Sequence, residues 1–338
     1  MIIDPISGIY TDKDIFWPHS TKGYFITIGL VFAGISVIMI PFSQNVMEFV
    51  ILILIFYAAS HFIRPPYNAL MPEVIRRKNW GEASGYINTF LALGSITAFL
   101  VIGPLIKVSL YYAAMLAGIL IISVGLITPW KIVESPIREK TEHKKGAITT
   151  LLKRKEMSIF FLMQLFWWAS YESIATYFYF LAKDFNLSLT PGGSAIIYVT
   201  IAFAIFNVTT VISSIPIGIL FGKTLRKKNL ITIGLIIMIL MELIGSFYHT
   251  SSMFLLIVLA IAGIGWAFIL TASYPLGAYL VKKFTGNKTP LGLFFGLNSV
   301  FTNGSIMIGA IGTAAIMLIF HISLIVVFPL SFIFSLIA

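Results

Sequence analysis

One apolar segment, residues 158–182, contains a group of polar and aromatic side chains that could do chemistry. Spacings of 4, 7, 8 and 15 residues from the first member place five of them on one face of a helix. They are Gln164, Trp168, Tyr171, Glu172 and Tyr179. Rings and a carboxamide suit a sugar, which has apolar faces and hydroxyl edges, and a carboxylate can carry a proton or hold a cation. A hydrogen bond between helices with no role in binding is the alternative for Glu172.

A second group lies at the end of the apolar segment 47–63. Arg64 follows this segment, and His61 precedes it by three residues. Arg64 could be the charge partner of a buried carboxylate or of a substrate. Alternatively, it extends to the membrane surface or pairs with Glu73 or Glu82. His61 is either a packed polar side chain or part of a proton relay, and the first reading is favoured.

The composition of the whole chain defines the environment of these residues. Of 338 residues, 58% are hydrophobic and 11% are charged, and the mean hydropathy is +0.96. Soluble domains are about 45–50% apolar and about 25% charged. This excludes a soluble enzyme, a disordered chain and a fibrous protein. The chain contains no cysteine, so it has neither disulfides nor thiolate metal sites. It is predicted to be an all-α polytopic membrane protein with no enzyme activity, metal or cofactor.

The apolar segments are long enough to cross a membrane as helices. A helix needs about 20 residues to cross the hydrocarbon layer, and it satisfies its own backbone hydrogen bonds there. Ten such segments are expected. They are 24–42, 47–63, 84–106, 109–130, 158–182, 194–221, 230–248, 253–280, 290–312 and 315–338.

The positions of the basic residues orient these segments. Ten crossings place alternate loops on opposite sides, and one side receives every Lys and Arg of the chain except Lys107 and Lys183. Loops rich in Lys and Arg face the cytoplasm. The cytoplasmic loops are therefore predicted to be 1–23, 64–81, 131–157, 222–229 and 281–289. The net charge of +10 orients the chain in a cell membrane and does not indicate nucleic-acid binding.

Short sequences recur in the same order along the chain, which predicts an internal duplication. Residues 26–30 recur as 231–235, an offset of 205. Gly8 with Lys13 matches Gly218 with Lys223, an offset of 210, and Asn88 matches Asn298 at the same offset. We expect a helix bundle at 1–130, a cytoplasmic linker at 131–157 and a six-helix bundle at 158–338. Mapped through the repeat, the first bundle lacks its first helix and most of its second, so ten helices of twelve are expected.

A basic loop between helices two and three of each half resembles the signature of the major facilitator superfamily. The signature is Gly-x-x-x-Asp-[Arg/Lys]-x-Gly-Arg-[Arg/Lys]; Gly8, Asp12 and Lys13 match its first part, and its later Gly-Arg pair is absent. The second copy retains Gly218 and Lys223. This resemblance implies the major facilitator fold, with helix seven lining a central cavity and helix ten contributing Trp266 and Tyr274. Asn298, in helix eleven, is either a substrate contact or a residue that holds helices together.

Two segments are similar to one branch of that superfamily. Asp4-Pro5-Ile6-x-Gly8 resembles a stretch of the glycoside–pentoside–hexuronide cation symporters. Residues 64–73, followed by 81–85, resemble the helix-four-to-five segment of their sucrose-carrier-like relatives. Those carriers usually have Arg directly before an Ala-Leu pair, where this chain has Asn68.

The function expected from these observations is secondary active transport of a small polar solute by alternating access. A sugar or glycoside moved by H⁺ or Na⁺ symport is the leading expectation, with the lipid bilayer as surroundings and a monomer as the state. One alternative is an exporter of amphipathic compounds from the same superfamily. Another is a non-transporting or inactive, truncated membrane protein.

Overall fold

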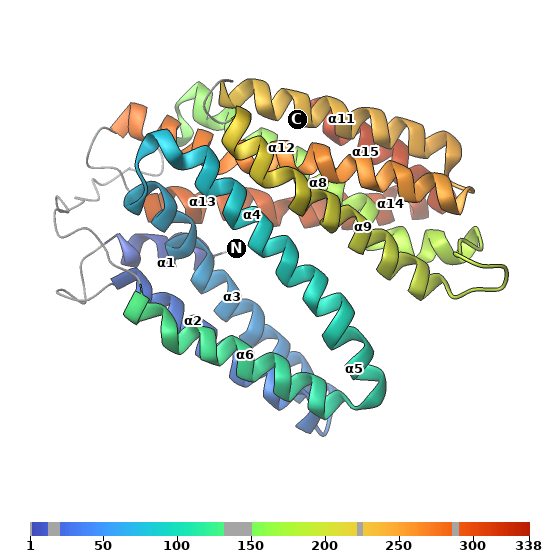
Figure 1. Cartoon of the computed structure of the whole chain (residues 1–338), viewed down its shortest axis with the longest axis horizontal. Helices are drawn as coiled ribbons and strands as arrows, with labels where there is room; N and C mark the ends of the chain where they lie inside the picture. The colour runs from blue at the N-terminus through green and yellow to red at the C-terminus, as the bar shows by residue number, and fades with distance from the viewer. Residues whose placement is uncertain (1, 13–20, 132–150, 222–225, 286–290) are drawn as a thin grey trace. The chain divides into compact units, whose positions relative to one another are not determined.

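The computed structural model describes residues 2–12, 21–131, 151–221, 226–285 and 291–338. Every regular element in these ranges is a helix, which confirms the all-α prediction (Figure 1). Eight helical stretches here are long and apolar enough to cross a membrane, and a shorter apolar one covers Leu324–Ile337. With α8 (Lys155–Asp184), these stretches account for the ten predicted segments.

The described residues form two compact units. Unit 1 comprises Met1–Arg77, Thr97–Arg154 and Ala278–Val300, and unit 2 comprises Lys78–Ile96, Lys155–Gly277 and Phe301–Ala338. The division of the chain at residues 130 and 157 stays a prediction, because most of the linker lies outside the described residues.

Unit 1 is built mainly on four helices from the first 131 residues of the chain. They are α1 (Ile3–Thr11), α2 (Thr21–Met39, extended by η1, Ile40–Phe42), α3 (Val46–Val74) and α6 (Leu110–Lys131), with the short α5 (Gly103–Val108) before α6. Helix α2 packs along both α3 and α6, and Figure 1 shows the three side by side. Gly34 and Gly118 permit the α2–α6 contact, because a Cβ on either glycine would lie within 3 Å of the other's carbonyl oxygen.

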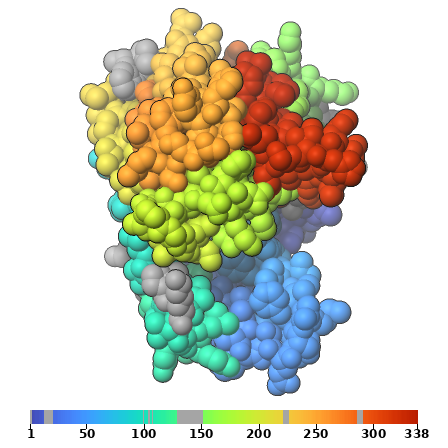
Figure 2. Space-filling model, turned by 90° about the vertical axis from the view of Figure 1, so that its right-hand side faces the viewer, coloured from blue at the N-terminus to red at the C-terminus, as the bar shows by residue number. Residues whose placement is uncertain are grey.

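Unit 2 is built on longer helices. They are η2 (Arg77–Asn79) with α4 (Trp80–Thr97), α8, α9 (Ala195–Pro216) with η4 (Ile217–Phe221), α11 (Lys227–Tyr248), α12 (Ser252–Thr285) and α15 (Val327–Ile337). Helix α15 packs on both α8 and α11. In Figure 2 the red segment of α15 borders the orange segment of α11 and α12.

Helix α3 is longer than expected, and the prediction that a loop begins at Arg64 is wrong. Asn45 caps the start of the helix by accepting a hydrogen bond from the Glu48 backbone N–H at 2.9 Å. The helix then continues past Pro65 and Pro66 to Val74. Membrane helices tolerate proline where neighbouring groups bond the freed backbone. The apolar run ends at Arg64, but the helix does not, so hydropathy alone gave the wrong boundary.

The boundary between the last two predicted segments is also wrong. The chain stays helical from α13 (Leu291–Ile306) through a π-turn, η5 (Met307–Ile311), into α14 (Gly312–Phe320). It turns at His321, whose φ of 50° is left-handed, and resumes with η6 (Leu324–Val326) and α15. The π-turn lets the helix continue through the glycines at 309 and 312.

Large apolar side chains lie on the outside of the helices. Val46, Phe247 and Leu318 are each more than 70% exposed. Exposed apolar patches of this extent mark a surface made for lipid or for partners. Together with the span lengths, this exposure supports a multi-pass membrane protein.

Candidate functional site

Aromatic side chains of three helices in unit 2 gather around Trp266 of α12. The centroid of its ring lies 4.6 Å from those of Trp167 and Tyr171, 5.2 Å from Trp168 and 5.7 Å from Phe206. Trp266 is 6% exposed. We call these five residues the ring cluster. Offset and edge-to-face contacts at these distances are favourable, so the cluster joins α8, α9 and α12 through packed rings.

The residues predicted to share one face of α8 have different neighbours. Trp168 and Tyr171 join the ring cluster, and buried Gln164 accepts a hydrogen bond from Trp167 Nε1 at 2.6 Å. Glu172 is half-buried and lies near η5, because a Cβ on Gly309 would come within 2.9 Å of the Glu172 Cβ. Tyr179 is exposed. The helical wheel placed these residues on one side, but it could not show which helix covers each one.

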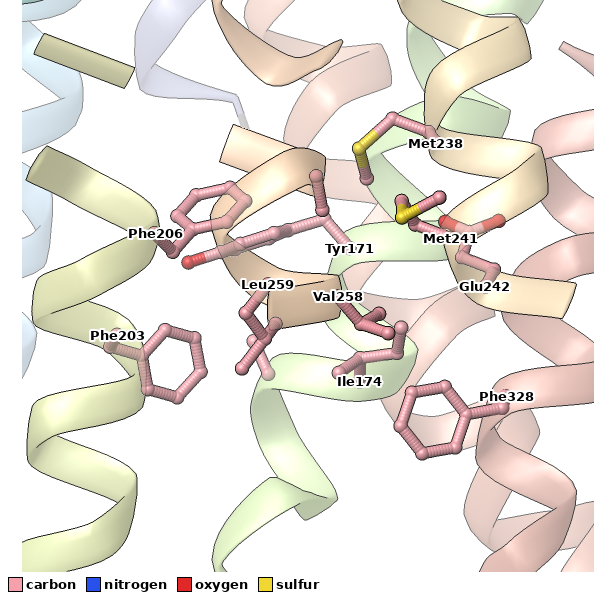
Figure 3. Close-up of a pocket in the computed structure, with 12 residues that line it drawn as sticks. Tyr171, Ile174, Phe203, Phe206, Met238, Met241, Glu242, Val258, Leu259 and Phe328 are labelled. Atoms are coloured by element: carbon pink, nitrogen blue, oxygen red, sulfur yellow. The ribbon is translucent and has the colours of Figure 1, made fainter. Parts of the chain in front are cut away.

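A cavity lies beside the ring cluster and inside unit 2. Its volume is about 450 Å³ when the solvent at its open side is included. Its walls come from α8, α9, α11, α12 and α15 (Figure 3). Rings, branched aliphatic side chains and two methionines form nearly all of its surface. The lining residues are Tyr171, Ile174, Ala175, Phe203, Phe206, Met238, Met241, Glu242, Val258, Leu259, Ala262 and Phe328.

Glu242 is the acidic side chain of this cavity. It is 3% exposed, and its Oε1 accepts hydrogen bonds from the hydroxyls of Ser170 at 2.5 Å and Ser335 at 3.0 Å. The Ser331 hydroxyl lies 2.8 Å from that of Ser170. Glu242 Oε2 has no hydrogen-bond partner among the described residues. Sequence reasoning did not select Glu242 as a site residue, although an ionisable residue inside a membrane segment is a signal of function.

In unit 1, His61 contacts a carboxylate that sequence analysis did not single out as a site residue. Its Nδ1 lies 3.2 Å from each carboxylate oxygen of Asp4, which is fully buried on α1. The Ser7 hydroxyl donates to the Phe62 carbonyl at 2.6 Å and adds a second bond between α1 and α3. Asp4 and His61 therefore form an acid–base pair, and the reading of His61 as part of a proton relay stays a hypothesis.

A buried ion pair lies in the same unit. Lys22 Nζ is 2.9 Å from Glu73 Oε2, and the lysine side chain is fully buried. Glu73, one of the two acidic partners considered for Arg64, thus forms an ion pair with Lys22. Arg64 is exposed on α3, next to the Pro65 position. Lys282 Nζ donates to the Pro72 carbonyl at 2.8 Å and so bonds the backbone of α3 near its end.

Asp12, from the predicted loop signature, caps the start of α13. Its carboxylate accepts from the backbone N–H groups of Gly292 at 2.8 Å and Leu293 at 2.9 Å. A carboxylate at a helix N-terminus is stabilised by the helix dipole. Burial raises the pKa of Asp12 from its usual value near 3.8, while Lys22 and the two N–H groups act in the opposite direction.

The remaining predicted site residues are distributed over both units. Gly8 lies against the Gly292 backbone, and Gly218 lies against that of Gly81. Asn298 is 3% exposed on α13, and Tyr274 is half-buried on α12. Lys13 and Lys223 are outside the described residues. No group of three His, Asp or Glu residues that could hold a metal occurs in the described part of the chain.

The sequence matches a known family over most of its length. Residues 5–309 match the model of the Major Facilitator Superfamily. The chain belongs to this superfamily. The family and its structural relatives are transporters, so this protein is a membrane transporter and not an enzyme.

Two relatives align along most of the chain. The "uncharacterized MFS-type transporter MJ1560" of Methanocaldococcus jannaschii is 27% identical over 303 residues, which is 86% of this chain and 73% of that protein. "Multidrug resistance protein 2" of Bacillus subtilis is 23% identical over 327 residues, or 92% of this chain and 76% of that protein.

Solved structures show the same fold. The transporter FucP, in its outward conformation, has a TM-score of 0.68 at 15% identity and covers 99% of this chain and 86% of its own. The human organic anion transporter MFSD10 has a TM-score of 0.67 at 14% identity, covering 99% of this chain and 80% of its own. These similarities establish the fold, and they leave the substrate open.

Proposed function

We propose that this superfamily member moves amphipathic organic compounds by secondary active transport, with alternating access to a site in the membrane. The cavity of unit 2 carries the proposal, because rings, methionines and aliphatic side chains form its walls. Such a surface binds apolar bodies better than hydroxyl-rich ones. The printed name of the Bacillus subtilis relative agrees with this class of substrate.

Transport by the purified full chain in proteoliposomes tests this proposal. An amphipathic dye and a labelled sugar are offered separately under an imposed pH or sodium gradient. We expect the gradient to drive movement of the dye and not of the sugar. Gradient-driven uptake of the sugar alone would overturn the proposal and favour the second candidate.

The second candidate is symport of a sugar or glycoside with H⁺ or Na⁺. It is supported by Gln164 beside the indoles of Trp167 and Trp168, and by the resemblance of residues 64–73 to sucrose-carrier-like proteins. We place this candidate second for two reasons. Gln164 Oε1 already accepts a hydrogen bond from Trp167 Nε1, and the cavity walls offer few partners for the hydroxyl groups of a sugar.

We propose Glu172 as the coupling carboxylate under either substrate. It is half-buried within α8, and a carboxyl in that setting can exchange a proton or cation as its surroundings change. Glu172→Gln retains the shape and removes the titration. We expect this variant to lose uphill accumulation while exchange down the substrate's own gradient partly survives. Normal accumulation by Glu172→Gln would place coupling elsewhere.

We propose that the protein is a monomer in the cell membrane. The distribution of basic residues places the 131–157 segment on the cytoplasmic side. A reporter fused after Glu142 should be active only on the cytoplasmic side, and one fused near Ser188 only outside. The opposite labelling would reverse the topology.

A further inference from the structure

We propose that two π-turns, η3 (Ala98–Ile102) and η5, are the points at which two long helices bend during transport, and that α8 controls the second one. This rests on the proposed function for the view that the protein works by alternating access, and it deepens that function by naming where the helices bend. Exchange of backbone amides is measured without any substrate, so the two proposals can fail separately.

Both π-turns lie inside continuous helices, at matching places in the predicted repeat. Helix α4 runs through η3 into α5 (Figure 1), and α13 runs through η5 into α14. The sequence Gly-Ser-Ile precedes both, at residues 94–96 before η3 and at residues 304–306 before η5, an offset of 210. Because π-turns are rare and often occur at functional sites, their recurrence after this motif indicates a shared role.

The glycine of this motif is not required for packing in either copy. No atom of a neighbouring helix lies within 4 Å of a Cβ added to Gly94, and the nearest to one on Gly304 is Leu165 Cδ1, at an ordinary 3.5 Å. In η4, another π-turn, a Cβ on Gly218 would instead meet the Gly81 carbonyl oxygen at 2.6 Å. A glycine inside a helix weakens it relative to alanine, because glycine loses more backbone freedom on folding. At Gly94 and Gly304 that weakness secures no close contact, so it serves bending.

Helices that belong to both units are irregular near the residue at which they pass from one unit to the other. The chain passes from unit 2 to unit 1 after Ile96, just before η3, and from unit 1 to unit 2 after Val300, a short distance before η5. Helix α12 passes between the units after Gly277, close to Pro275. Prolines and π-turns are the usual causes of bends in helices. Since alternating access moves one bundle against another, these are the places at which a shared helix can absorb the change.

Two hydroxyl groups of α8 hold η5. Tyr177 Oη donates to the Ala310 carbonyl oxygen at 2.6 Å. Ser173 Oγ shares its hydrogen between the carbonyl oxygens of Ala169, at 2.8 Å, and Gly309, at 3.3 Å. We call Tyr177 and Ser173 the latch. Side-chain hydroxyls can satisfy backbone groups where a membrane helix departs from regular α geometry, so the latch stabilises this π-turn and its release would free η5 to bend.

The latch is next to Glu172, the proposed coupling carboxylate. Glu172 precedes Ser173 in the chain, and its Cβ would be 2.9 Å from a Cβ added to Gly309. That approach requires glycine at position 309, because an added Cβ would also collide with the Ala169 carbonyl oxygen. A gain or loss of charge on Glu172 therefore acts on the backbone that the latch holds. In this way the coupling carboxylate controls the bend at η5.

Hydrogen exchange of backbone amides, followed by mass spectrometry on the detergent-purified full chain, tests the latch. Tyr177→Phe keeps the ring and removes the hydroxyl. We expect the amides of residues 307–314 to exchange roughly two- to tenfold faster, because one hydrogen bond to the π-turn is lost. Tyr179→Phe is the matched control, since Tyr179 is an exposed tyrosine of the same helix. Its exchange should match that of the unmodified chain.

Two results would overturn the latch. Unchanged exchange at η5 in Tyr177→Phe would show that the hydroxyl does not hold the π-turn. Equally faster exchange in α9 and α11 would show a general loss of stability with no local role. Glu172→Gln should alter exchange at residues 307–314 by at least about twofold and leave α9 unchanged. If exchange at these residues stayed the same, control of η5 by Glu172 would be overturned.

Gly304→Ala tests the bending itself, because the added methyl group fits without a clash. If Gly304 had only a structural role, this variant would keep both its thermal stability and its transport. If η5 is a bending point, the thermal midpoint should stay equal or rise, while dye turnover in proteoliposomes should fall at least about threefold. Full turnover by Gly304→Ala would overturn the proposal. If the unmodified chain moved no amphipathic dye, the proposed function would fail, and the exchange results would still decide the latch.

Discussion

Two close backbone contacts, one in each unit, occupy equivalent places in the predicted internal repeat. In unit 1, α1 lies against α13, and a Cβ on Gly8 would be 2.2 Å from the Gly292 carbonyl oxygen. In unit 2, η4 lies against the start of α4, and a Cβ on Gly218 would be 2.6 Å from the Gly81 carbonyl oxygen. Gly8 and Gly218 are 210 residues apart, and Gly81 and Gly292 are 211 apart.

A second pair of backbone contacts recurs at the same offset, but the residues that form it differ in charge. Gly296 lies against the Asp4 backbone in unit 1, and Gly85 lies against that of Ser214 in unit 2, with carbonyl oxygens 2.6 Å from the added Cβ in both cases. At the same offset of 210 residues, Asp4 corresponds to Ser214. Likewise, Asp12, which caps α13, corresponds to Gly222 in the sequence. The two copies share the close packing of backbones, and unit 1 alone carries these carboxylates.

The largest effect on stability is expected from the buried ion pair of unit 1. Glu73→Gln leaves Lys22 charged and fully buried, which should cost about 3 kcal/mol of unfolding free energy. Lys22→Met combined with Glu73→Met removes both charges and should recover most of that loss. Thermal unfolding in detergent measures the two variants. Equal losses in the single and double variants would show that the pair is not coupled.

The two glycine contacts should respond alike if the repeat preserves them. Gly8→Ala and Gly218→Ala each force a methyl group against a backbone carbonyl, and each should cost about 2 kcal/mol. Gly94→Ala is the control, because nothing lies within 4 Å of an added Cβ there. Thermal unfolding of the three variants checks this. If Gly8→Ala lowered the thermal stability and Gly218→Ala left it unchanged, the close contact would be important in unit 1 alone.

A smaller effect is expected where the copies differ in charge. Asp12→Asn keeps one acceptor for the α13 N–H groups and loses the other, which should cost about 1 kcal/mol. Burial raises the pKa of Asp12 above 3.8, so the folded chain holds this proton more tightly than the unfolded chain. The stability that Asp12 contributes therefore falls as the pH rises from near 4 through the raised pKa.

Thermal midpoints of the wild type and Asp12→Asn from pH 4 to pH 7 measure this dependence. The advantage of the wild type over the variant should shrink with rising pH. An advantage that grows over this range would mean that Lys22 and the two N–H groups outweigh burial, and that the pKa is lowered.

Sequence reasoning could predict most of the fold because hydropathy and basic loops constrain a membrane chain strongly. It missed the end of α3 because the helix continues beyond Arg64, where the apolar run ends. It also separated the last two segments at Gly312 and not at His321, since no residue pattern marked the left-handed turn.

The candidate site was less predictable. Trp168, Tyr171 and Trp266 do meet, as α8 and α12 pack together. The wheel of α8 could not show that Glu172 lies near η5, nor that Glu242 of α11 reaches a cavity. Those facts depend on which helices become neighbours, and a single sequence does not specify crossing angles or contacts between distant helices.

The most direct measurement of the central claim maps where an amphipathic compound binds. An aryl-azide derivative of triphenylphosphonium is photoactivated with the full chain, and labelled peptides are identified by mass spectrometry. Labels should fall on α9 near Phe203 and Phe206 and on α11 near Met238 and Met241, with excess tetraphenylphosphonium abolishing them. Labelling that spares these two segments, or that excess tetraphenylphosphonium leaves unchanged, would contradict a ligand site in the cavity of unit 2.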